Sequence, residues 1–268
     1  MRFFKASSAG NAFLVIREAA ARRRGQALGE LAARLCRTDT GIGADGVVFL
    51  RRRRQGTGFR IFNRDGGEAE LSGNGMASAA AFLMLKSGGA AVTLDTRVGP
   101  RRVELLGGEE RALHLRVEIG PPDFTARHLF PFLDTATAPM EYRGIEFFPV
   151  SVGNPHAVVF REGAETGWAA VGERLAGAPI FPCGVNVEVV TAVAPDRATV
   201  RFWERGVGRT PASSTGSSAA FAVLRARGLV DPDLTLESEG GEVLLSERLG
   251  AIQIEVTTLP VARGDFWD

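Results

Sequence analysis

The sequence predicts an α+β protein with two similar lobes, and three observations lead to this prediction. Motifs of the first half recur in the second half in the same order and at almost the same distance. Short runs of β-branched and aromatic residues, which are typical of strands, are spread over both halves. Each half also has one Ala-rich stretch after a tetrapeptide of small residues, a pattern that favours a helix. We therefore expect each lobe to be a strand-rich sheet or barrel around a central helix.

The prediction of two lobes depends on the internal repeat. The tetrapeptide at 8–11, Ser-Ala-Gly-Asn, recurs 143 residues later at 151–154 as Ser-Val-Gly-Asn. The pentapeptide at 41–45, Gly-Ile-Gly-Ala-Asp, has an echo at the same distance at 184–188, Gly-Val-Asn-Val-Glu. A period of this length has the size of a domain, which indicates a duplicated lobe and not a solenoid.

The most distinctive repeated feature is a serine before each predicted central helix. Ser72 opens Ser-Gly-Asn-Gly before the Ala-rich stretch 76–86, and Ser213 opens Ser-Ser-Thr-Gly before the stretch 217–227. Two helix N-termini that converge would hold an anion and stabilise negative charge that develops beside it. A simple helix N-cap explains either serine alone. Because both recur with their flanking sequence, we favour a site.

Local patterns predict the remaining elements. Leu31 and Leu35, four residues apart, predict a helix over 29–37, and the two central helices are expected to end at Gly88 and Gly228. Strands are predicted at 46–50, 59–62, 113–117, 157–160, 187–193, 198–203, 242–245 and 251–256.

The boundary between the lobes is expected near 117–122, where a predicted strand gives way to Gly-Pro-Pro. The first lobe is then 1–117, and the second begins at residue 118.

The composition excludes several classes of protein. With 32 basic and 31 acidic residues, the net charge of +1 gives no electrostatic reason to expect a nucleic-acid partner. The sequence has no apolar run long enough to span a bilayer and no signal peptide at its start. Its two cysteines and three scattered histidines have no disulfide framework or metal-ligand spacing. We expect a cytoplasmic protein without a metal and without a membrane or nucleic-acid partner.

Several polar residues near the repeated turns are candidates for a ligand site. Glu204 and Arg205 put an acid and a base together at the end of a strand, where they fit either an amino-acid ligand or a surface ion pair. His156 follows Gly-Asn-Pro, close to the repeated turn, and could orient or deprotonate a neighbouring group. Four asparagines lie in or beside Gly-flanked turns or strand ends, a position where Asn is often only structural: Asn11, Asn63, Asn154 and Asn186.

These residues are also the ones that carry a resemblance to a known family. The chain resembles diaminopimelate epimerase over essentially its full length, with matching motifs in the same order at 10–13, 41–46, 61–66, 153–156, 184–186 and 204–208. The resemblance implies two lobes related by a pseudo-twofold axis, an active site in the cleft between them, and a homodimer. It also implies that residues 259–268 return to the first lobe, which leaves 118–258 to the second.

The resemblance further implies a reaction: inversion at the α-carbon of L,L- or meso-diaminopimelate, a precursor of lysine and peptidoglycan, without a cofactor. By resemblance, Glu204 holds the distal ammonium, and His156 and Glu204 assist the proton transfer. The distal carboxylate is expected to bind Asn63, Asn154, Asn186 and Arg205. The reacting end is expected to bind Asn11 and the backbone of Gly73, Asn74, Ser214 and Thr215.

The family uses two thiols, one from each lobe, and this chain has Ser72 and Ser213 at those positions. Ionising a thiol with a pKa near 8.5 at neutral pH costs about 2 kcal/mol. Ionising a hydroxyl with a pKa near roughly 15.7 costs about 12 kcal/mol. The difference of about 10 kcal/mol corresponds to roughly seven powers of ten in rate if nothing compensates.

The serines leave three interpretations open: a slow diaminopimelate epimerase, a racemase or isomerase of another amino acid, and a catalytically silent amino-acid-binding relative. Whether the serines are natural or introduced also stays open. Cys36 and Cys183 remain in the chain, whereas Ser78 and Ser218 stand where family members often have further cysteines. This pattern favours natural divergence. Ala12, Arg209 and Ser214 depart from the family as well.

Overall fold

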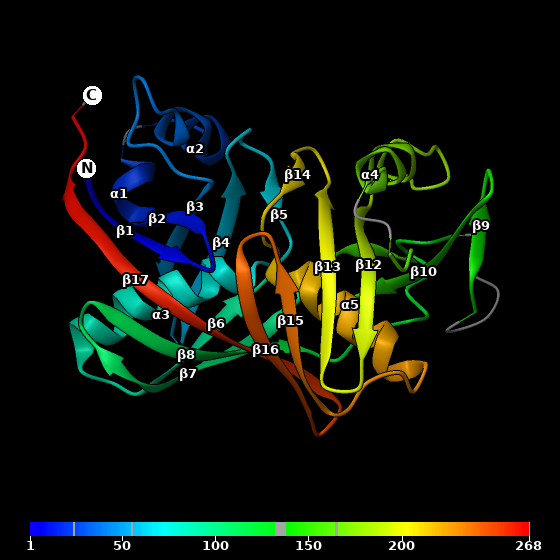
Figure 1. Cartoon of the computed structure of the whole chain (residues 1–268). Helices are drawn as coiled ribbons and strands as arrows, with labels where there is room; N and C mark the ends of the chain where they lie inside the picture. The colour runs from blue at the N-terminus through cyan, green and yellow to red at the C-terminus, as the bar shows by residue number, and fades with distance from the viewer. Residues whose placement is uncertain (24, 55, 132–137, 164–165, 268) are drawn as a thin grey trace. The chain divides into compact units, whose positions relative to one another are not determined.

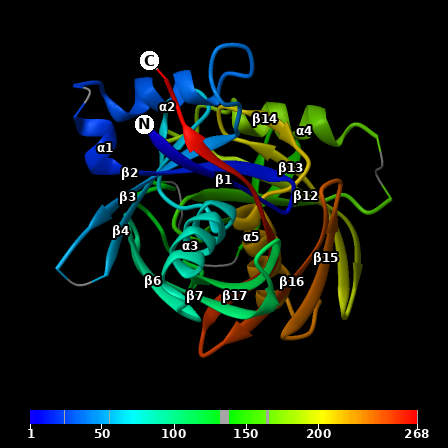
Figure 2. The ribbon, with the colours of Figure 1, turned by 90° about the vertical axis from the view of Figure 1, so that its left-hand side faces the viewer.

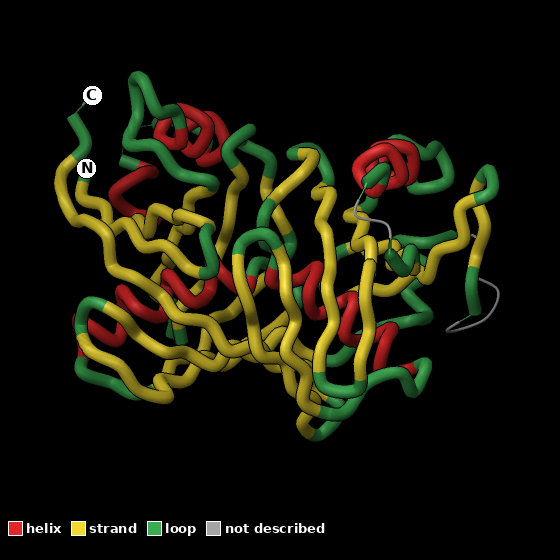
Figure 3. The backbone as a smooth tube through the Cα atoms, viewed as in Figure 1, coloured by secondary structure: helices red, strands yellow, loops and turns green. Residues whose placement is uncertain are grey.

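The chain forms two units in the computed structural model, which describes residues 1–268 except 24, 55, 132–137, 164–165 and 268 (Figure 1). Unit 1 comprises Met1–Glu118 and Glu255–Asp268, and unit 2 comprises Ile119–Ile254. Each unit has strands around one long helix, with shorter helices outside (Figure 3). The α+β class predicted from the sequence is confirmed.

The strands of unit 1 close into a barrel. Each strand pairs with the next, and the last pairs again with the first. In pairing order they are β17 (Ala251–Asp265, from Glu255 on), β1 (Arg2–Ser8), β2 (Asn11–Arg17), β3 (Gly46–Arg52), β4 (Thr57–Asn63), β6 (Ala91–Thr96), β7 (Gly99–Glu109) and β8 (Ala112–Gly120). The two-residue strand β5 (Glu68–Ala69) adds to β4.

The central helix of unit 1 is α3 (Gly73–Ser87), which lies inside the barrel (Figure 2). It contacts β1, β2, β3, β6 and β7, so its small residues are buried on every side of the helix. A Cβ atom at Gly75 would lie 2.5 Å from Cδ1 of Ile61, which explains the glycine. The helix ends at Gly88, whose φ of 71° is the left-handed conformation that glycine adopts without strain. Helices α1 (Glu18–Arg22) and α2 (Leu28–Cys36) pack on the outside of β2, β3 and β4.

Unit 2 repeats this plan. Its strands show the same succession of antiparallel and parallel pairs as β1 to β7. They are β10 (Ile145–Ser151), β11 (Pro155–Phe160), β12 (Asn186–Ala194), β13 (Arg197–Glu204), β14 (Gly208–Thr210), β15 (Asp233–Ser238) and β16 (Gly241–Arg248), with β9 (Met140–Tyr142) added to β10. The central helix is α5 (Ser214–Ala226), which contacts β10 to β13 and β16, and α4 (Trp168–Ala176) packs outside on β12 and β13. The matching order of elements confirms the internal duplication.

The motif pair 41–45 and 184–188 is out of register in the structure. Phe13 of β2 lies opposite Gly46, and His156 of β11 lies opposite Asn186. Phe13 and His156 are 143 residues apart, but Gly46 and Asn186 are 140 apart, because the connection between the paired strands is shorter in unit 2. Strand pairing therefore makes Asn186 the counterpart of Gly46, and aligning 41–45 with 184–188 is wrong by three residues.

The predicted strands and helices are all present, with ends within a few residues except for the last strand, which runs to Asp265. The local sequence patterns did not predict α4 and several strands, including β6, β7 and β15. In the described part of the chain, no helix is long and apolar enough to cross a membrane.

Candidate functional site

The two serines have matched geometries at the N-termini of the central helices. Ser72 is the N-cap of α3, with φ −155° and ψ 118°, and its Oγ accepts a hydrogen bond of 3.1 Å from the N–H of Gly75. Ser213 is the N-cap of α5, with φ −146° and ψ 119°, and its Oγ accepts a bond of 3.1 Å from the N–H of Gly216. Both serines therefore do cap the helices, as the simpler interpretation had it. They differ in exposure: Ser213 is buried and Ser72 is half-buried.

The first turn of α3 connects to the repeated asparagine of unit 1. Gly73 and Asn74 are buried in this turn, and Nδ2 of Asn74 donates a hydrogen bond of 2.7 Å to Oδ1 of Asn11. Asn11 is the first residue of β2, after a turn in which Ala9 and Gly10 have positive φ. The bond fixes the oxygen of the Asn11 carboxamide.

The corresponding asparagine of unit 2 is held differently. Oδ1 of Asn154 lies 2.9 Å from Nε2 of His156, and Nδ1 of His156 lies 2.8 Å from Oε1 of Glu188. His156 is fully buried, and Glu188 is 1% exposed. Both ring nitrogens of His156 are thus occupied within unit 2, so this histidine orients neighbouring groups.

Asn186 and Arg205 form a second connection in unit 2. Nδ2 of Asn186 donates to the carbonyl oxygen of Pro155 at 2.9 Å, and its Oδ1 accepts from the backbone N–H of Arg205 at 3.0 Å. The guanidinium of Arg205 donates to the carbonyl oxygen of Cys183 at 2.7 Å, and its aliphatic part lies over Gly184. Asn186 therefore braces the start of β11 against the turn after β13.

The remaining predicted residues lie at strand ends or in the first turn of α5. Asn63 ends β4, and its backbone forms a tight turn with Gly66 and Gly67. Glu204 ends β13, next to Arg205. Ser214 and Thr215 are buried in the first turn of α5.

The directions of the strands place these residues at one edge of each unit. In unit 2, β11 and β12 run parallel and begin at the edge where the antiparallel β13 ends. Asn154, His156, Asn186, Glu204 and Arg205 therefore lie around that edge. In unit 1, the starts of β2 and β3 and the end of β4 meet in the same way. The predicted residues of each unit thus lie at the edge where its central helix begins, and we refer to these two groups as the candidate half-sites.

Glu188 also lies in this region, and the sequence patterns assigned it no role. In the sequence, a glutamate within a strand of β-branched residues is most simply taken as a charge that faces solvent. In the structure, Glu188 is buried next to Gly216 of α5. Burial raises the pKa of its carboxyl above the usual range, and the neighbouring His156 opposes that effect. A charged residue inside an otherwise apolar strand is the signal that could have identified it.

The thiol of Cys36, unlike the hydroxyls of Ser72 and Ser213, is not a candidate functional group. Burial raises the pKa of the Cys36 thiol to about 12, so it is neutral and unreactive at neutral pH. Across the described residues, no group of three or more His, Cys, Asp or Glu side chains is placed to hold a metal ion.

The sequence model of diaminopimelate epimerase matches two stretches of this chain, 3–125 and 148–258, one in each repeat. The chain belongs to the diaminopimelate epimerase family. It is 33% identical over 222 residues to the diaminopimelate epimerase of Microcystis aeruginosa, covering 79% of both chains. It is 37% identical over 234 residues to that of a Synechococcus species, covering 80% of this chain and 79% of the relative. The chain is therefore an isomerase, of the amino-acid epimerase type.

Solved structures of low sequence identity share the fold. A predicted epimerase from Pseudomonas aeruginosa superposes with a TM-score of 0.72 at 16% identity, covering 100% of this chain and 99% of the other. A hydroxyproline epimerase from Agrobacterium vitis, with trans-4-hydroxy-L-proline bound, gives a TM-score of 0.70 at 17% identity, covering 98% and 90%. These matches support the fold described above for this chain.

Proposed function

We propose that this protein epimerises L,L-diaminopimelate to meso-diaminopimelate by proton transfer between Ser72, Ser213 and the two faces of the α-carbon. The observation that carries the proposal is the matched pair of helix N-termini. Each places a hydroxyl oxygen beside the backbone N–H groups of a first helical turn, and in unit 1 that turn is hydrogen-bonded to the repeated Asn11. Such N-termini stabilise a carboxylate and the negative charge that develops on it when the α-proton leaves.

The roles of the other residues follow from their chemistry. Asn11 and the backbone N–H groups of the first turns suit the α-carboxylate, since an amide donor and a helix N-terminus both favour an anion. Arg205 suits the distal carboxylate and Glu204 the distal ammonium. Asn63, Asn154 and Asn186, which lie at strand ends, are proposed to bind the distal carboxylate together with Arg205.

The serine hydroxyls make this a slow enzyme. Each Oγ accepts an N–H bond from the helix, and a hydrogen bond to a charged group contributes about 1.5–3 kcal/mol. The helix dipole adds roughly 0.3–1 kcal/mol. Together these offset only part of the deficit of about 10 kcal/mol relative to a thiol pair.

A second candidate is an amino-acid-binding protein without turnover. The observation that favours it is the N-cap geometry itself, because a capping hydroxyl needs no catalytic role to be explained. A third candidate, supported by the structural similarity to the hydroxyproline epimerase, is inversion of another amino acid.

The proposal is tested by incubating the protein with L,L-diaminopimelate in deuterated water and following deuterium at the α-carbon. We expect slow incorporation together with formation of the meso isomer. Tight binding without incorporation would reject turnover and favour the binding protein. Neither binding nor exchange would reject the substrate.

Restoring the thiols sharpens the test. The double variant S72C/S213C should exchange several orders of magnitude faster, because each thiol ionises far more readily than a hydroxyl. The matched control S78C/S218C adds two thiols to the same helices away from the N-caps, and should not gain activity. Equal rates for the two double variants would contradict the assignment of Ser72 and Ser213.

We also propose that the protein is a homodimer in the cytoplasm, acting in the supply of lysine and peptidoglycan precursors. Light scattering of the purified chain tests the dimer, and a monomer at micromolar concentration would reject it.

A further inference from the structure

A chain of buried polar contacts in unit 2 ends at the half-site. Oε1 of Glu188 lies 2.8 Å from Nδ1 of His156, and Nε2 of His156 lies 2.9 Å from Oδ1 of Asn154. All three residues are at most 8% exposed, and Oε2 of Glu188 has no hydrogen-bond partner among the described residues. A buried carboxyl with an unpaired oxygen is costly, so its presence requires a reason.

The contacts of His156 determine where its ring carries protons. The carbonyl oxygen of Asn154 accepts, so Nε2 of His156 carries a proton. The proton between Nδ1 and Glu188 then lies on the ring, giving an imidazolium with a carboxylate, or on the carboxyl, giving two neutral groups. In both cases the pair is neutral overall and directs an N–H at Asn154.

This arrangement fixes the polarity of the Asn154 carboxamide. With Oδ1 held by His156, the Nδ2 group is the end of the amide that can turn to a ligand. A donor in that position favours a carboxylate. Without the donor on Nε2, the amide can rotate and present its oxygen instead, which repels an anion.

Unit 1 shows that the fold does not need the pair. By strand register, His156 corresponds to Phe13 and Glu188 corresponds to Val48. Phe13 and Val48 are buried apolar residues in a barrel of the same plan. Replacing a buried ion pair by apolar residues is commonly neutral or stabilising, so stability alone does not account for His156 and Glu188.

The helix above Glu188 is shaped around its carboxyl. A Cβ atom at Gly216 would lie 2.9 Å from Oε1 of Glu188. The groups that face Glu188 are His156 from β11, Phe202 from β13 and Gly216 from α5. His156 is the ionisable one among them.

We propose that Glu188 is a positioning residue that, through His156, fixes the Asn154 carboxamide with its Nδ2 directed at a carboxylate of the ligand. This inference rests on the proposed function for the identity of the ligand, diaminopimelate. It does not depend on it for the arrangement of the three side chains.

The test compares E188Q with E18Q, both made in the S72C/S213C background so that kcat and KM can be measured. Glu18 is the matched control, because it is also buried, has one oxygen bound to Arg22, and has Oε2 without a partner in the described structure. We expect E188Q to raise KM for diaminopimelate roughly tenfold, the effect of one lost hydrogen bond, with kcat less affected. E18Q should change neither constant. Equal KM values for both variants would overturn the proposal.

A second measurement is independent of any ligand. Nitrogen-15 NMR of the histidine rings at neutral pH should show a protonated Nε2 on His156 of the parent protein, and a changed His156 spectrum in E188Q. An unchanged His156 spectrum in E188Q would reject the positioning role. If no variant binds diaminopimelate, the proposed function fails, and the NMR result still decides the role of Glu188.

The double variant H156F/E188V copies the apolar pair of unit 1. It should fold with a stability close to that of the parent and bind diaminopimelate at least tenfold more weakly. Undiminished binding by this folded variant would also overturn the proposal.

Discussion

At the scale of single residues, environment decides what each polar side chain does. Ser72 and Ser213 share backbone angles and hydrogen bonds, so the structure makes them equivalent N-caps. His156 and Asn186 instead form hydrogen bonds to neighbours within unit 2. A polar residue that faces a ligand and one that only holds two segments together look alike in the sequence. Their contacts in the folded chain distinguish them.

The buried thiol of Cys36 predicts how stability depends on alkaline pH. The native thiol keeps its proton until about 12, whereas its ordinary pKa is 9.0. Between these values the unfolded state binds fewer protons than the native state, so stability falls as pH rises. We expect urea unfolding midpoints in reducing buffer to drop between pH 9 and 10.5, and to drop less steeply in C36A. C183S, which changes an exposed cysteine, is the control and should keep the parent slope. An equal slope in C36A would contradict the assignment.

At the scale of elements, a turn supports the segment that carries Ser213. The guanidinium of Arg209 in β14 makes two hydrogen bonds to Glu239, at 3.2 and 2.8 Å. The N–H of Gly240 donates to the carbonyl oxygen of Pro211 at 2.7 Å. The turn between β15 and β16 therefore holds the residues that lead into α5. Arg209 therefore has a structural role in this turn.

The close approach of this turn predicts the effect of G240A. A Cβ atom there would lie 2.6 Å from Cβ of Ala212 and 3.0 Å from the oxygen of Pro211, so one segment must move. We expect a loss of about 1–3 kcal/mol in unfolding free energy, as for other overpacked sites. Hydrogen exchange at the first turn of α5 should become faster. G107A is the control, since a Cβ at Gly107 meets nothing within 4 Å. If the two variants are equally stable, the turn does not support the segment.

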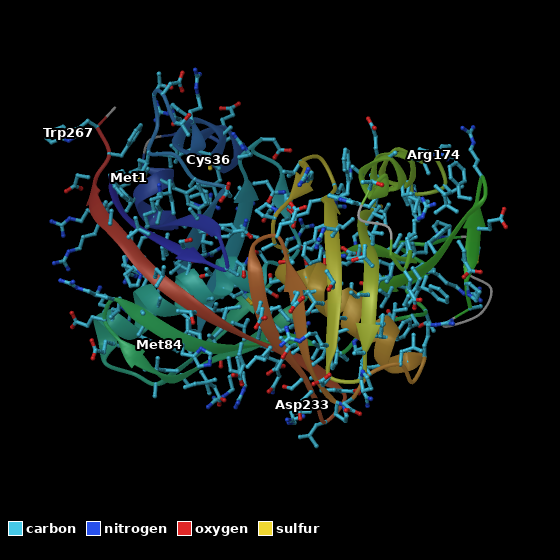
Figure 4. All side chains as sticks on the ribbon, in the orientation of Figure 1. Met1, Cys36, Met84, Arg174, Asp233 and Trp267 are labelled. Carbon is cyan, nitrogen blue, oxygen red and sulfur yellow. The ribbon has the colours of Figure 1, made fainter. Side chains whose placement is uncertain are left out.

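At the scale of the whole molecule, the last strand, β17, contains residues of both units. β17 starts within unit 2, and from Glu255 on it lies in unit 1, where it pairs with β1 and β8 and closes the barrel. Oγ1 of Thr258 is 2.8 Å from Oγ of Ser8, and both side chains are fully buried. The side chain of Trp267, near the end of the chain, is 88% exposed (Figure 4). The closing strand is therefore an integral part of unit 1, whereas Trp267 adds little to its core.

Removing the closing strand should unfold unit 1 selectively. A chain that ends at Ile254 leaves the edges of β1 and β8 unpaired and the hydroxyl of Ser8 without Thr258. We expect amide protection in α3 and β1 to be lost. A chain that ends at Phe266 is the control and should keep it. Full protection of α3 in the shorter chain would contradict the structural role of β17.

Sequence patterns alone were enough to predict the number of repeats, the class of fold, the central helices and the family. These features depend on local patterns: the period of apolar residues, glycines at helix ends, and motifs that recur at a domain-sized distance. Helix α3 is an example, because its capping serine, its small residues and Gly88 all lie within one short segment.

The folded structure was needed to see the register of the repeats, the burial of Glu188 beside His156 and the hydrogen bonds of Asn186. These depend on which strands pair and on what lies across the core, and strand pairing joins residues far apart in the chain. Glu188 illustrates the limit: its strand sequence reads as apolar, and its partner His156 is 32 residues away. Burial and hydrogen bonding between distant residues are properties of the folded chain, so a charge in an apolar strand marks Glu188 as unusual but does not identify His156 as its partner.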